Sequence, residues 1–133
     1  MKHDKLFKKK GDILILNTPS YVDMSWVNHD TSIKGYYEYV LIFTHTLEEM
    51  ENAIIKAISI LNEEGVLYLL YPKLKNKLNL KGIHRDHILP YLEVSEETGY
   101  YKNTLMRFNM MASFDDNYTI LGIKKDKYYR KRR

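Results

Sequence analysis

The sequence predicts an α/β domain in which a mostly parallel sheet is flanked by helices and closed by a C-terminal antiparallel β-hairpin. Three observations support this fold class. The main apolar runs are continuous rather than alternating, which is typical of strands buried on both faces. An amphipathic helical pattern separates two of these runs. Near the C-terminus, turn-forming residues join two further strand-like segments.

The length of 133 residues suits one domain with a substantial core. We expect a basic extension over residues 1–10, a single α/β domain over 11–124 and a basic tail over 125–133. The absence of cysteine excludes thiol catalysis, disulfides and thiolate metal sites. No secretory signal pattern is present, and no apolar run approaches the about 20 residues of a membrane span. We therefore expect a cytoplasmic protein with no membrane partner.

The three continuous apolar runs are the candidate central strands. They cover residues 13–16, 39–43 and 66–71, and each is followed by polar or turn-forming residues. Because parallel strands end at the same edge of a sheet, the segments that follow these runs should lie together. Open parallel sheets bind ligands at that edge.

The clearest helix lies between the second and third runs. Thr46 is a candidate N-cap, and Glu49 completes a capping box. Apolar side chains then recur at helical spacing on one stripe, at Met50, Ala53, Ile54, Ala57, Ile58 and Leu61. Gly65 is the expected stop signal. The strand–helix–strand unit over residues 39–71 should have a right-handed crossover.

The remaining elements have weaker signals. Residues 20–28 could form a short helix with Tyr21 and Met24 turned inward, and residues 31–33 could form a small edge strand. A second helix is expected near residues 83–92, limited or kinked by Pro90. Strands are expected over residues 104–114 and 118–125, joined by a turn at Asp115-Asp116-Asn117.

The net charge of +4 is unevenly distributed. The first ten residues carry +4 and the last ten carry +6, so the 113 residues between them carry −6. An acidic body argues against a nucleic-acid-binding face on the domain. The tail offers two interpretations: it could contact nucleic acid, or it could be a solubilising terminus. The residues of the first interpretation are Lys127, Arg130, Lys131, Arg132 and Arg133.

Several short motifs resemble a small bacterial family of domains of unknown function. They are Asn17-Thr18-Pro19 after the first strand, Tyr71-Pro72-Lys73 after the third, Arg85-Asp86 in the next helix and Asp115-Asp116 before the last strand. The resemblance spans about residues 11–124, and Tyr118 departs from the Trp that the family tends to have. The order of elements looks like a shortened class I methyltransferase. The resemblance thus implies a Rossmann-like fold, and it brings no established activity.

The bend after the first strand argues against an adenosyl cofactor. Working methyltransferases have a glycine-rich turn there, which lets the backbone approach the cofactor. The corresponding segment, Asn17-Thr18-Pro19-Ser20, contains no glycine, and Pro19 has no N–H to donate. The glycine fingerprints of dinucleotide and phosphate loops are also absent. We therefore expect no cofactor and no methyl transfer.

Five of the six candidate ligand-binding residues lie at the predicted strand ends. The sixth, Arg85, lies in the next helix, where it could instead form an ion pair with Asp86 or anchor the Lys73 loop. The other five are Asn17, Thr18, His45, Tyr71 and Lys73. Lys73, with Lys75 and Lys77 at alternate positions, could hold a carboxylate or phosphate, or the three could belong to a solvated loop. His45 could move protons near neutral pH, or it could simply face water.

Two other clusters are weaker candidates. His84 and His87 are spaced to share a metal on a helix, but no third ligand is visible, so we expect no metal site. Asp115 and Asp116 could act as an acid–base pair only if they share a pocket; otherwise they form the turn. No catalytic residue is assigned.

The leading interpretation is a Rossmann-like module without methyltransferase activity. It would bind a small anionic ligand or a protein partner at the carboxyl ends of the strands. One alternative is a diverged methyltransferase-like enzyme that uses His45 or Lys73. The other is a protein associated with nucleic acid through its basic tail.

Overall fold

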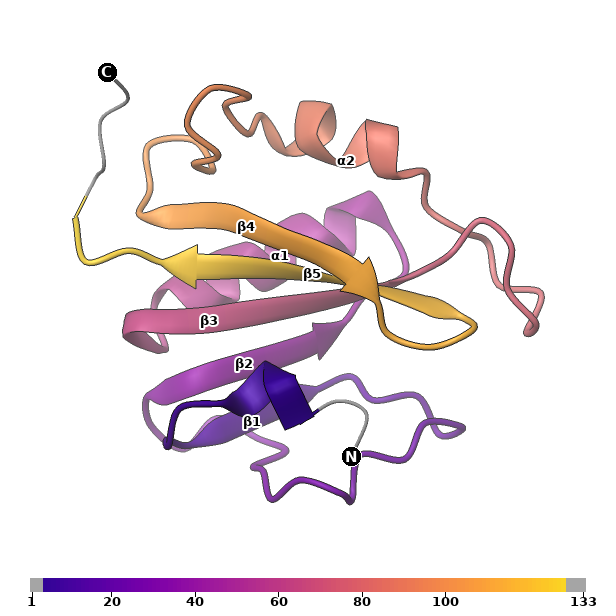
Figure 1. The fold of residues 1–133 in the computed structure, drawn as a ribbon, viewed down its shortest axis with the longest axis horizontal. Coiled ribbons are helices and arrows are strands. Elements are labelled where there is room, and N and C mark those ends of the chain that lie inside the picture. Colours follow the sequence, from indigo (N-terminus) through magenta and orange to yellow (C-terminus); the bar gives the residue numbers. More distant parts are fainter. Residues whose placement is uncertain (1–3, 129–133) are drawn as a thin grey trace.

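The computed structural model describes residues 4–128, and within them five strands form one mixed sheet (Figure 1). The strand order is β1-β2-β3-β5-β4. The elements are the 3-10 helix η1 (Asp4–Phe7), β1 (Ile13–Leu16), β2 (Tyr37–Phe43), α1 (Leu47–Ile58), β3 (Leu61–Pro72), α2 (Arg85–Leu92), β4 (Met106–Ser113) and β5 (Tyr118–Lys125). The predicted α/β class is confirmed.

The sheet combines a parallel half with an antiparallel half. Strands β1, β2 and β3 are parallel neighbours, as predicted. Strand β5 lies antiparallel between β3 and β4, so the C-terminal hairpin closes the sheet. Two of the four strand pairs are therefore antiparallel, which corrects the expectation of a mostly parallel sheet.

The two α-helices of the described residues cover the same face of the sheet. Figure 1 shows α1 behind the strands and η1 in front of them. The front face is covered by η1 and by the irregular segment that follows β1. Phe7 packs edge-on against Tyr39 and Tyr68, with ring centroids 5.2 and 6.0 Å apart. The α-helices of the described residues thus flank one face only, and the 3-10 helix η1 of the basic N-terminal segment supplies part of the cover on the other.

The start of α1 follows the predicted capping pattern. The backbone N–H of Glu49 donates to the Thr46 hydroxyl over 3.0 Å. The Glu49 carboxylate accepts from the N–H of His45 rather than that of Thr46, over 2.9 Å. The helix ends at Ile58, before the predicted stop, because Leu61 already pairs with Tyr37 as the first residue of β3.

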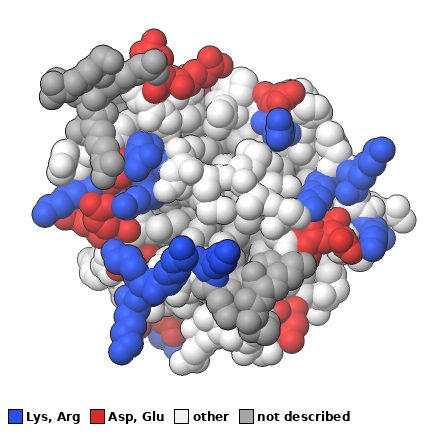
Figure 2. Space-filling view, in the orientation of Figure 1, with Lys and Arg blue, Asp and Glu red and all other residues white. Residues whose placement is uncertain are grey.

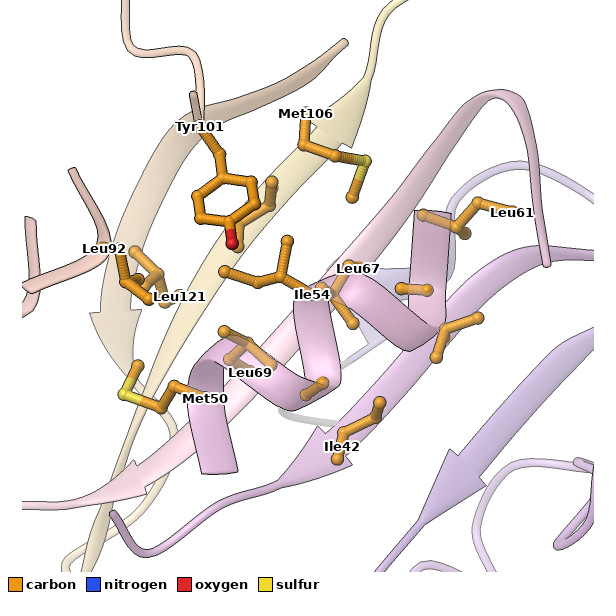
Figure 3. Close-up of a cluster of buried hydrophobic side chains, with 14 of the residues drawn as sticks. Ile42, Met50, Ile54, Leu61, Leu67, Leu69, Leu92, Tyr101, Met106 and Leu121 are labelled. Atoms are coloured by element: carbon orange, nitrogen blue, oxygen red, sulfur yellow. The ribbon is translucent and has the colours of Figure 1, made fainter. Parts of the chain in front are cut away.

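The predicted apolar stripe of α1 packs on the sheet, apart from Leu61. Figure 3 shows Met50 and Ile54 directed towards Leu67 and Leu69 of β3 and Leu121 of β5. All five side chains are at most 3% exposed. Burying one such side chain contributes about 1.5–3 kcal/mol, so this contact is a main source of the fold's stability.

The segment between β1 and β2 contains neither the predicted helix over 20–28 nor the predicted strand over 31–33. Met24 is buried as expected, whereas Tyr21 is 51% exposed. Asp30 instead pairs with β1 through backbone hydrogen bonds to Ile13 and Ile15. The Tyr37 hydroxyl donates to the Asp30 carboxylate over 2.6 Å, which fixes the segment against the outer edge of β1.

The C-terminal elements lie close to their predicted positions. Helix α2 contains Pro90 and ends at Leu92, and its C-cap Glu93 has a left-handed conformation with φ 58°. The Asp115 carboxylate accepts from the N–H groups of Asn117 and Tyr118, both over 2.8 Å, and so forms the predicted turn. Strand β5 matches its predicted bounds, and β4 is three residues shorter than predicted.

Candidate functional site

Three of the six candidate ligand-binding residues line one cavity of about 360 Å³. Tyr71 and Lys73 come from the end of β3, and Arg85 is the first residue of α2. The cavity, here called the Lys73 pocket, lies between these residues and the end of β4. Its other lining residues are Leu74, Ile83, Met111, Ala112, Ser113 and Thr119.

The charged side chains of the Lys73 pocket are both cations. The Lys73 ammonium donates to the Ser113 hydroxyl over 2.6 Å, and it has no carboxylate partner within residues 4–128. The Arg85 side chain is 74% exposed, and its Nε lies 3.9 Å from Asp86. No Asp or Glu lines the pocket. The two cations therefore favour an anion at this position.

The rest of the pocket lining is largely apolar. Leu74, Ile83, Met111 and Ala112 contribute to it. The Tyr71 hydroxyl lies 3.7 Å from the Met111 sulfur. Burial raises the pKa of Tyr71, while a hydrogen bond with Thr119 and the nearby Arg85 charge act in the opposite direction. Tyr71 is thus a neutral phenol at physiological pH, beside the side chains of Lys73 and Arg85.

The loop that carries Lys73 is held by two asparagines that the sequence analysis did not select. The Asn76 amide donates to the carbonyls of Lys73 and Leu80 and accepts from the N–H groups of Leu78 and Leu80. Asn117 accepts from the N–H of Lys73 through its carbonyl, over 2.9 Å. The loop is therefore structured rather than simply solvated.

Gly82 closes the same loop by a close approach of two backbone segments. A Cβ at this position would lie 2.4 Å from the Lys73 carbonyl oxygen and 2.5 Å from the Leu74 Cα. Because both neighbours are backbone atoms, no side-chain rotation could relieve the clash. Gly82 therefore fixes the distance between the start of the Lys73 loop and the residues leading into α2.

His45 lies outside the Lys73 pocket and contacts a buried tyrosine instead. Its Nε2 is 2.7 Å from the Tyr118 hydroxyl, which is also 2.7 Å from the Tyr21 hydroxyl. Burial, followed by the hydrogen bond with Tyr21, raises the pKa of Tyr118. The three side chains form a continuous hydrogen-bonded chain across the ends of β2 and β5. Nothing in the sequence spacing signals this contact, because His45 and Tyr118 are 73 residues apart.

His45 also lines a second cavity, of about 250 Å³, with His84 and His87. The rings of His84 and His87 lie 5.1 Å apart, and His84 Nδ1 accepts from the Asp86 N–H as the N-cap of α2. Within residues 4–128, no group of three His, Cys, Asp or Glu side chains is arranged to hold a metal ion.

The other candidate residues are dispersed. Asn17 and Thr18 are exposed, and Asn17 adopts a left-handed conformation with φ 61°. Neither lines the Lys73 pocket or the His45 cavity. Lys127 is exposed, and Arg130, Lys131, Arg132 and Arg133 lie outside the described residues.

Two further groups belong to the surroundings of the site. Lys75 and Lys77 line a neighbouring shallow cavity with Asp116. An ion pair with Asp116, over 2.8 Å, raises the pKa of Lys77. Asp115 lines a different cavity, beside Tyr118, so the two aspartates do not share a pocket.

On the face shown in Figure 2, Lys and Arg side chains form several separate groups, the most extended of them at the lower left, and Asp and Glu side chains lie near them. Phosphate backbones are bound by clustered basic side chains. The distribution on this face is therefore not that of a continuous nucleic-acid-binding surface. No helix within the described residues is long and apolar enough to cross a membrane.

No family model matches this chain, and no curated protein matches it either, so membership of the bacterial family stays a prediction. Among solved structures, the chain is similar to phosphoethanolamine N-methyltransferase 2 of Haemonchus contortus, in complex with phosphomonomethylethanolamine and S-adenosylhomocysteine. The sequence identity is 14% and the TM-score is 0.48. The match covers 96% of this chain and 36% of that one, so this chain spans about a third of its length.

Proposed function

We propose that this chain is a Rossmann-like binding module that holds a small anionic ligand in the Lys73 pocket. The observation that carries the proposal is the placement of two cations, Lys73 and Arg85, on one cavity that no carboxylate lines. Charge-assisted hydrogen bonds from Lys and Arg to carboxylate or phosphate oxygens are among the strongest in proteins.

The apolar wall of the pocket limits the choice of anion. Leu74 and Met111, which are 58% and 41% exposed, would remain in contact with water around a small hydrated ion. A ligand with an apolar body and one anionic head would bury these side chains while it keeps its charge beside the cations. A carboxylate with an apolar substituent therefore fits the lining better than inorganic phosphate does.

The proposed module does not transfer methyl groups. Strand β1 ends at Leu16. Asn17, with φ 61°, Thr18 and Pro19 follow, and no glycine lies in this bend. The side chains of Thr18 and Pro19 would obstruct the close backbone approach that an adenosyl cofactor needs, and Pro19 has no N–H to donate to it. Heating the protein with S-adenosylmethionine tests this: we expect an unchanged melting temperature, and a clear rise would contradict the proposal.

The anion site is tested by thermal unfolding in the presence of benzoate, acetate or phosphate at constant ionic strength. A ligand that binds only the folded state raises the melting temperature. Benzoate should stabilise the wild type most. Lys73→Ala and Arg85→Ala should each weaken its binding about fivefold, the effect expected for a partly exposed charge pair. Lys75→Ala is the matched control, because Lys75 lies on the same loop outside the pocket. An equal loss in the control would contradict the proposal.

A further inference from the structure

Part of the outer edge of β4 is open. A loop covers the first half of the strand: the Phe108 N–H donates to the Gly99 carbonyl and the Tyr101 N–H donates to the Met106 carbonyl, both over 2.8 Å. Beyond Phe108, no backbone group of the described residues bonds to the outer side of residues 109–113. Four of these five residues are exposed.

The register shows which backbone groups point outward. The Phe114 N–H donates to the Tyr118 carbonyl, and Ser113 pairs with Thr119 and Met111 with Leu121. Because hydrogen-bonded and non-hydrogen-bonded pairs alternate in an antiparallel ladder, the N–H and C=O groups of Met111 and Ser113 face away from β5. These groups are available to an additional strand.

Apart from a register shift between Phe108 and Met110, this edge lacks the features that usually prevent strand addition. Edge strands are commonly protected by charged side chains, proline or a covering segment. Residues 109–113, with the sequence Asn-Met-Met-Ala-Ser, contain no charge and no proline. The opposite edge of the sheet is protected, because Asp30 pairs with the outer side of β1. The open stretch is therefore specific to β4.

The open edge leads directly into the Lys73 pocket. Met111, Ala112 and Ser113 line this pocket together with Lys73 and Arg85. A strand that pairs with β4 in the parallel direction would end beside Ser113, where its terminal carboxylate would meet both cations. Main-chain pairing and carboxylate capture are two established modes of peptide recognition, and here they would act on one ligand.

We propose that the anionic ligand is the C-terminal carboxylate of an extended peptide, which adds to β4 as a parallel strand. This inference rests on the proposed function of the Lys73 pocket and names its ligand class. The apolar lining at Leu74, Ile83 and Met111 favours an apolar C-terminal residue. The basic tail of a second copy fits poorly, because its cations would face Lys73 and Arg85.

The test uses the full chain labelled with ¹⁵N and a short peptide with uncharged side chains. The peptide ends in valine and is long enough to pair with residues 109–113. Three matched probes separate the contributions: the free acid, its C-terminal amide and a free acid with alternate backbone nitrogens methylated. We expect the unmethylated acid to bind about tenfold more tightly than either of the other two, because each lacks one class of hydrogen bond. The backbone amide signals of Met111 and Ser113 should shift when the unmethylated acid is added.

Three outcomes would overturn the inference, and they can be distinguished from failure of the pocket itself. Equal binding of the methylated acid would exclude strand pairing, while acetate or benzoate binding at Lys73 would still support an anion site. Equal binding of the C-terminal amide would exclude binding of the peptide's carboxylate by Lys73 and Arg85. Concentration-dependent shifts of Met111 and Ser113 without peptide, with a dimer in sedimentation, would assign the edge to a second copy.

Discussion

The Nε2 atom of His45 and the hydroxyl of Tyr118 lie 2.7 Å apart, at the ends of two strands that are separated by β3 in the sheet. Tyr118 has no exposed surface, and its hydroxyl also bonds with Tyr21. Because one buried oxygen serves two partners, it links the segment after β1 to the start of α1.

Tyr118→Phe should therefore destabilise the fold. The change removes both hydrogen bonds and leaves the ring packing unchanged, so we expect a loss of about 1–2 kcal/mol in the free energy of unfolding. Tyr21→Phe removes only the bond at the exposed end and should cost less. Urea denaturation of the two variants measures the difference, and equal stability of Tyr118→Phe and wild type would show that the contact contributes nothing.

Alkaline pH should destabilise the protein through its buried tyrosines. Burial, with a smaller effect of Tyr39, raises the pKa of Tyr68 to about 12, and the pKa of Tyr118 is raised in the same direction. Unfolded tyrosines lose their proton near pH 10. The stability that the neutral folded phenols provide is thus complete below about pH 10 and is lost as the pH rises towards 12.

This pH dependence is measured as the free energy of unfolding together with phenolate absorbance. Tyr68→Phe should reduce the slope above about pH 10, whereas Tyr36→Phe should leave it unchanged because Tyr36 is 69% exposed. A folded protein in which all 12 tyrosines titrate together near pH 10 would refute the expectation.

The start of the predicted tail contains a residue that belongs to the folded core. Asp126 is 1% exposed, and it accepts from the Tyr100 hydroxyl over 2.6 Å and from Arg107 Nε over 2.8 Å. Asp126→Ala would leave the largely buried Arg107 charge without this partner. We expect a loss of about 3 kcal/mol in chemical denaturation.

Asp116→Ala is the matched control for Asp126→Ala. Its ion pair with Lys77 joins two side chains that are 70% and 77% exposed, so the loss should stay below about 1 kcal/mol. Similar losses in the two variants would contradict the structural role of Asp126.

The conformation of the Lys73 loop depends on Asn76. Asn76→Ala removes four hydrogen bonds to the backbone, and we expect a loss of about 1–3 kcal/mol, faster amide exchange at Leu78 and Leu80, and weaker binding of benzoate. Asn103→Ala, at an exposed turn, should change none of these. Unaltered exchange at Leu80 in Asn76→Ala would show that the loop holds its shape by other means.

Elements with a local signal could be predicted from the sequence. The apolar run of β1, the N-cap Thr46 and the Asp115 turn depend on residues close to one another in the chain, and all three are confirmed. The end of α1 was predicted wrongly because Leu61 pairs with Tyr37, and Lys125 donates to the carbonyls of Ile58 and Leu61. Such long-range contacts leave no periodic pattern.

The difference between local signals and long-range contacts also explains the outcome for the segment after β1 and for the candidate site. No helix forms near Tyr21, because its contacts are with Tyr118 rather than with its own neighbours. Tyr71 and Lys73 were predicted from the end of a strand and Arg85 from the Arg-Asp pair in the next helix. All three line one cavity, and a ligand there is still a prediction. Strand-end reasoning also selected His45, whose partner lies in β5 and whose position could be read only from the assembled sheet.

The most direct test of the account is to locate benzoate on the ¹⁵N-labelled protein by following backbone amide shifts during a titration. We predict saturable shifts at Lys73, Arg85 and Ser113, and Lys73→Ala should move their midpoint to an about fivefold higher benzoate concentration. Saturable shifts confined to the His45 cavity or to the bend at Asn17, with none around Lys73, would contradict this prediction.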